Sequence, residues 1–60
     1  MCEFRVTLDN KTIFQNAVHA KILGNKIVVQ DAIGSSLELE DCAIIEVDIK
    51  TELLSLIKVR

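Results

Sequence analysis

Cys2 is the first residue of the sequence that could do chemistry, because its thiol follows Met1 and lies within chelating reach of the chain's α-amine. If Met1 is retained, its amine, the Cys2 backbone nitrogen and the Cys2 sulfur can form fused small chelate rings around one metal ion. If Met1 is removed, the amine and thiolate of Cys2 still close a ring. This mixed nitrogen and sulfur donor set suits Ni(II) or Cu(II), which favour square-planar coordination. One terminus supplies two or three donors, so two termini meeting across a homodimer axis would complete a four-coordinate site.

Cys2 also has a simpler interpretation as a core residue. It lies in phase with Phe4, Val6 and Leu8, the apolar side of an alternating run. Cysteine is often a buried small hydrophobe, and the pattern by itself favours core packing. The residues alone therefore leave both roles open.

The other potential ligands are more simply structural or solvated. We expect Cys42 to be an unreactive strand residue rather than a second ligand. His19 alternates with apolar positions and is expected to be a solvated imidazole, the alternative being an extra nickel ligand or a proton-sensitive neighbour of the site. Glu38, Glu40 and Asp41 form an acidic run that predicts a solvated strand face, with weak binding of a hard cation as the alternative.

The residue inventory argues against catalysis. With one histidine, the chain cannot build a zinc site from two or three histidines, and it has neither a Gly-x-Ser-x-Gly elbow nor a glycine-rich phosphate loop. Phe4 and Phe14, the only aromatic residues, both fall in apolar patterns and offer no stacking platform for single-stranded nucleic acid. Seven Lys and Arg against nine Asp and Glu give no basic footprint for phosphates. We expect a binding protein, not an enzyme, and nucleic acid is disfavoured as a partner.

Alternation of apolar and polar residues predicts a series of short strands. They are expected over residues 4–8, 12–15, 18–22, 26–30, 37–40, 42–49 and 53–59, separated by turn residues at 9–11, 24–25, 34–36 and 50–52. Helix is the alternative for residues 37–56, which are rich in leucine and glutamate and lack proline. The β-branched Ile44, Ile45, Val47 and Ile49 favour strands there. The expected fold is all-β: six to seven short antiparallel strands in a small barrel or sandwich.

The length and composition set the remaining expectations. Sixty residues allow one small β domain over residues 1–60. Of the residues, 50% are hydrophobic. We expect this to give more apolar surface than so small a monomer can bury, and we therefore predict a homodimer. No apolar run approaches the roughly 18 residues of a membrane span, and no signal peptide is evident. Two cysteines are no disulfide framework, so we expect a cytoplasmic protein with reduced thiols.

Three segments carry a resemblance to a known family: Met1-Cys2-Glu3 before an alternating strand, Asp31-Ala32-Ile33-Gly34 near the middle, and Ile45-Glu46-Val47-Asp48-Ile49 before the last strand. In this order, and over nearly the whole chain, they resemble the CooT-type small nickel-binding proteins. The resemblance implies a short all-β homodimer of barrel, SH3-like character that handles nickel. It also implies that Cys2 is the nickel ligand, with the Met1 amine as its companion, and that a nickel enzyme receives the metal.

The sequence departs from this family at two positions. Cys42 stands where relatives commonly have glycine, and Ile33 stands where they have an aromatic residue in the central turn. Neither change touches the expected ligand.

Two alternatives to nickel binding remain. Similar sequences carry a label of predicted RNA-binding protein, and a small RNA-binding β-barrel would be favoured if Arg5, Lys21, Lys26 and Lys58 gathered on one face. The other alternative is a metal-independent interaction module that recruits a partner chain through an edge strand.

Overall fold

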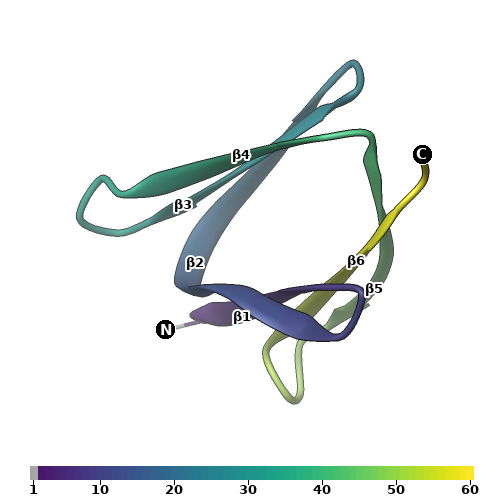
Figure 1. Ribbon diagram of the computed structural model, residues 1–60. Helices are drawn as coiled ribbons and strands as arrows, with labels where there is room; N and C mark the ends of the chain where they lie inside the picture. Colours follow the sequence, from purple (N-terminus) through teal and green to yellow (C-terminus); the bar gives the residue numbers. More distant parts are fainter. Residues whose placement is uncertain (1) are drawn as a thin grey trace.

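Six β-strands make up the fold in the computed structural model, which describes residues 2–60 (Figure 1). They are β1 (Phe4–Leu8), β2 (Lys11–Leu23), β3 (Lys26–Asp31), β4 (Ser36–Glu40), β5 (Cys42–Asp48) and β6 (Leu53–Lys58). The all-β expectation is confirmed, and the helical alternative for residues 37–56 is wrong.

All six strands belong to one sheet, in the order β4-β3-β2-β1-β6-β5. Four neighbouring pairs are antiparallel, but β1 and β6 run parallel, with Arg5 opposite Leu53 and Leu8 opposite Leu56. The expectation of purely antiparallel pairing is therefore wrong. The parallel pair continues beyond both strand ends, because the Arg5 amide donates to the Glu52 carbonyl at 2.8 Å and the Asp9 amide donates to the Leu56 carbonyl at 3.0 Å.

The sheet curls without closing. Strands β4 and β5 lie at its two edges and do not pair with each other, so the expected closed barrel or two-sheet sandwich is corrected to one open, curved sheet. In Figure 1, β2 bends between the half formed by β3 and β4 and the half formed by β1, β6 and β5. The inner side of this bend carries the core. Its six buried hydrophobic residues are Val6, Ala17, Ile27, Val29, Leu54 and Leu56.

Strand β2 is continuous where the sequence predicts two strands, at residues 12–15 and 18–22. Asn16, with φ of 63°, lies at an irregularity where Phe4 pairs with Ala17 but Val6 pairs with Phe14. A second irregularity follows between Ala17 and His19. Such bulges insert an extra residue and bend the strand, but they do not end it. The polar break at Asn16 therefore bends one long strand.

The left-handed backbone at Asn16 gives a direct stability prediction. A β-branched residue is poorly accommodated at positive φ, so Asn16→Val should lower the free energy of unfolding by about 1–2 kcal/mol. Asn16→Gly, the matched control, adopts the same backbone without that strain. Urea denaturation followed by far-UV circular dichroism measures both variants, and equal stability of the valine variant and wild type would contradict the assigned bend.

Many apolar side chains remain outside the core. Within residues 2–60, eight large aliphatic side chains are between 42% and 90% exposed, with Ile33 at the upper limit. This is consistent with more apolar surface than one copy buries. The described residues contain no helix long and apolar enough to cross a membrane.

Candidate metal site at the amino terminus

The Cys2 thiol is free and exposed. Core packing, which its phase with Phe4 and Val6 favours, is therefore wrong for the single chain. The physical reason is position: β1 begins at Phe4, and Ala17, the partner of Phe4, is the last residue of β2 to pair with β1. Beyond Ala17, β2 pairs only with β3, so Cys2 has no strand partner although alternation assigns it to the apolar face.

The segment after Cys2 is anchored to the turn between β5 and β6. The Glu3 amide donates a hydrogen bond to Glu52 Oε2 at 3.2 Å, and the Arg5 amide donates to the Glu52 carbonyl at 2.8 Å. Two contacts with one residue fix the direction in which the chain leaves the sheet. Cys2 therefore carries an accessible thiol, and the backbone that follows it is fixed by hydrogen bonds. Met1, the other expected metal-binding residue, lies outside the described residues.

The structure gathers no cluster of potential metal ligands among residues 2–60, that is, no group of three or more His, Cys, Asp and Glu side chains that could hold a metal ion. Cys42 lies half-buried in β5, where its Sγ donates to the Glu40 carbonyl at 3.3 Å and the side chain packs against the core. Its expected place in a strand is confirmed. A site of several donors built on Cys2 therefore needs Met1 or a second copy.

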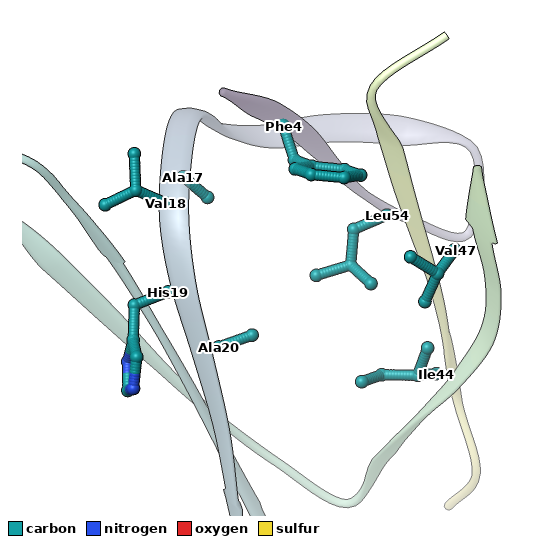
Figure 2. A pocket seen from close by; sticks show the side chains of 8 residues that line it. All are labelled: Phe4, Ala17, Val18, His19, Ala20, Ile44, Val47 and Leu54. Atoms are coloured by element: carbon teal, nitrogen blue, oxygen red, sulfur yellow. The ribbon is translucent and has the colours of Figure 1, made fainter. Parts of the chain in front are cut away.

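His19 is exposed on β2, as expected for a solvated imidazole. It borders an apolar cavity of about 220 Å³ that Cys2 does not line. Figure 2 shows Ala17 and Ala20 projecting from β2 toward Phe4 and Leu54, whereas Val18 and His19 project from the other side of the strand. The irregularity between Ala17 and His19 explains why two consecutive side chains lie on that side. Val18 accordingly leaves the apolar face on which alternation places it.

The cavity itself is a feature that the sequence analysis missed. Its interior wall is formed by Phe4, Ala17, Ala20, Ile44, Val47 and Leu54, on four different strands. A signal for it exists in the two alanines of β2, because small side chains facing larger ones leave space between the strands. Alternation predicts that these positions are apolar, but it does not reveal that the alanine side chains are too small to fill the space inside the bend of β2.

Glu38 and Glu40 lie exposed on β4, as expected of a solvated strand face, whereas Asp41 is half-buried in the bend between β4 and β5. Lys26 engages the two glutamates. Lys26 Nζ lies 3.1 Å from Glu38 Oε2 and 4.0 Å from Glu40 Oε2. Asp41 has φ of 58°, and its Oδ1 accepts a hydrogen bond from Asn25 Nδ2 at 3.4 Å. Lys26 therefore lies in exposed ion pairs with both glutamates of β4.

The Lys26 pair supports a prediction about proton affinity. The hydrogen bond from Lys26 to Glu38 raises the pKa of the ammonium group, the charge of Glu38 adds to this, and the charge of Glu40 contributes less. Glu38→Gln should therefore lower the pKa of Lys26 more than Glu40→Gln does. An NMR pH titration of the lysine side chain measures both shifts, and the reverse order would contradict the geometry.

In comparisons with known proteins, no family model matches the chain and no curated protein matches it. The fold and the site are those of a small protein with one open, mixed β-sheet and an exposed cysteine before its first strand.

Proposed function

We propose that this protein is a cytoplasmic nickel-binding protein that coordinates Ni(II) through the Cys2 thiolate and the Met1 amine. It acts as a homodimer of open, SH3-like sheets, and it buffers the metal or passes it to a nickel enzyme. The observation that carries the proposal is the exposure of Cys2. A thiol that alternation assigns to the core, but that the sheet leaves in solvent, is available to a metal ion.

The chemistry of the donors favours this role over catalysis. A thiolate and an amine form an electron-rich pair that suits nickel, and deprotonated backbone nitrogens can complete a planar set. A single chain presents no further group of ligands among residues 2–60. Two amino termini in a homodimer supply the four donors that one terminus lacks.

Charge-transfer absorption tests the proposal. Added Ni(II) should produce a thiolate-to-nickel band, and the band should persist in Cys42→Ser, because the only other cysteine is then Cys2. Loss of the band in Cys42→Ser would show that Cys42, and not Cys2, binds the metal. No band in either protein would refute nickel–thiolate coordination.

Nickel affinity should rise with pH. The thiol and the amine must both lose a proton before they bind, so each adds up to about a tenfold gain in affinity per pH unit while it is still protonated in the free protein. Competition with a chelator of known affinity, repeated over a range of pH, measures the slope. An affinity independent of pH would exclude these two donors.

A further inference from the structure

Strand β4 forms one open border of the sheet (Figure 1). It pairs with β3 alone, and its five residues follow one unbroken register along that strand. Strand β5, at the other border, pairs with β6 alone and carries an irregularity between Ile44 and Glu46. Such bulges interrupt the row of backbone groups that another strand would need. Strand β4 is therefore the regular edge, and the one suited to receive an extended chain.

The hydrogen bonds between β3 and β4 identify which backbone groups of β4 face outward. At one end of the pair the Asp31 amide donates to the Ser35 carbonyl, and at the other end the Asp41 amide donates to the Asn25 carbonyl, both at 2.9 Å. In an antiparallel pair, hydrogen-bonded positions alternate with positions that are not hydrogen-bonded to each other. The residues of β4 whose backbone groups point away from β3 are therefore Ser36, Glu38 and Glu40.

The same positions carry the acidic side chains of the strand. Glu38 and Glu40 are exposed, whereas Leu37 and Leu39 are half-buried and pack against the core. One outward carbonyl, that of Glu40, accepts a hydrogen bond from the Cys42 thiol at 3.3 Å. An antiparallel strand added at this edge would exchange two backbone hydrogen bonds with Glu38. The side chain opposite Glu38 would then lie on the same face of the sheet as the carboxylate.

The charge of this edge selects the kind of chain that can add to it. Six of the nine acidic residues fall within residues 36–52, where Lys50 is the only basic residue. A second copy that added antiparallel at the centre of β4 would place Glu38 opposite Glu38, and like charges directly opposite each other destabilise a sheet. Lys26 on β3 shows the favourable alternative, since its Nζ lies 3.1 Å from Glu38 Oε2 and 4.0 Å from Glu40 Oε2. The edge thus opposes self-pairing and favours a basic strand.

We propose that β4 is the docking edge for an extended, basic segment of a partner protein, which adds to the sheet as a further antiparallel strand. Lysine or arginine at every second position of this segment faces Glu38 and Glu40. The apolar residues between them lie beside Leu37 and Leu39. Backbone hydrogen bonds supply the affinity, and the alternation of basic and apolar residues supplies the specificity. This surface does not use Cys2, so the inference goes beyond nickel binding.

Amide hydrogen exchange tests the docking edge with a defined probe. The probe is a nine-residue peptide with capped ends that alternates lysine and valine and has lysine at both ends. With excess peptide, the amide hydrogens of Glu38 and Glu40 should exchange at least tenfold more slowly, as measured by NMR. Those of Leu37 and Leu39, which already bond to β3, should change by less than threefold. Unchanged exchange at the two glutamates, or slowing confined to β5, would overturn the proposal.

Two modified peptides separate strand addition from simple attraction of charge. A methyl group on the amide nitrogen of the central lysine removes a hydrogen bond to β4 and should weaken binding at least tenfold. The same change on a neighbouring valine, whose N–H points away from β4, is the matched control and should weaken binding by less than threefold. Equal losses for the two peptides would contradict the addition of a strand.

A pair of protein variants locates the binding edge. Glu38→Gln and Glu46→Gln each remove one exposed glutamate, and they therefore change the net charge equally, but Glu46 lies on β5. At low salt, Glu38→Gln should weaken binding of the unmodified peptide at least fourfold, whereas Glu46→Gln should weaken it by less than twofold. Equal weakening would show that the attraction is not localised at β4. Protection of the Glu38 amide that grows with protein concentration, without peptide, would assign the edge to a second copy and overturn the proposal.

Discussion

Serine in place of Cys2 should lower the affinity for Ni(II) by at least about 100-fold, because mutation of groups that merely orient metal ligands already costs about 10–100-fold. The hydroxyl of serine stays protonated and replaces a strong, soft donor with a weak one. Competition titration against a chelator measures the affinity of each variant.

The fold should survive this change. Cys2 is exposed and precedes β1, so its replacement leaves no cavity in the core. Cys42→Ser is the matched control, because it changes the other cysteine, which is half-buried in β5 and packs against the core. Nickel affinity in Cys2→Ser equal to that of Cys42→Ser would contradict the proposed ligand.

Leu56→Ala should produce the largest loss of stability, about 2–5 kcal/mol. Leu56 is 1% exposed and belongs to β6, which pairs with both β1 and β5. A domain of this length has a total stability of only about 3–9 kcal/mol. The loss is therefore a large fraction of the total stability, and the variant should unfold at a much lower urea concentration than the wild type.

Ile49→Ala provides the comparison for Leu56→Ala, since it removes an aliphatic side chain that is 69% exposed. Its effect should stay within about 0.5 kcal/mol. Urea denaturation followed by far-UV circular dichroism measures both. Similar midpoints for the two variants would show that Leu56 is not the packed centre of the sheet.

Local patterning predicts the strands because alternation reflects which side of a sheet is buried. Val6, Ile27 and Leu54 are all buried where alternation or apolar runs place them. The turns at Asp9-Asn10 and Gly24 adopt positive φ, as their residue types predict. Local patterning does not reveal which strands pair with each other. The parallel pairing of β1 with β6 joins the two ends of the chain, and no local signal in the sequence encodes it.

The metal-binding chemistry of the candidate site was predictable from the sequence, but the exposure of the Cys2 thiol was not. The position of Cys2 beside Met1 is plain in the sequence, whereas its burial depends on whether another strand pairs with the segment before β1. The shift of Val18 away from the apolar face likewise depends on the bulge after Ala17, which alternation does not reveal. The cavity between β2 and β5 arises from the same bend.

Native mass spectrometry with and without nickel tests the central claim most directly, because it counts chains and metal ions in one species. The proposed arrangement predicts one nickel ion per two chains in the wild type, and a nickel-free dimer in Cys2→Ser. One nickel ion on a single chain, or the same metal count in Cys2→Ser, would contradict a site shared by two Cys2 thiolates.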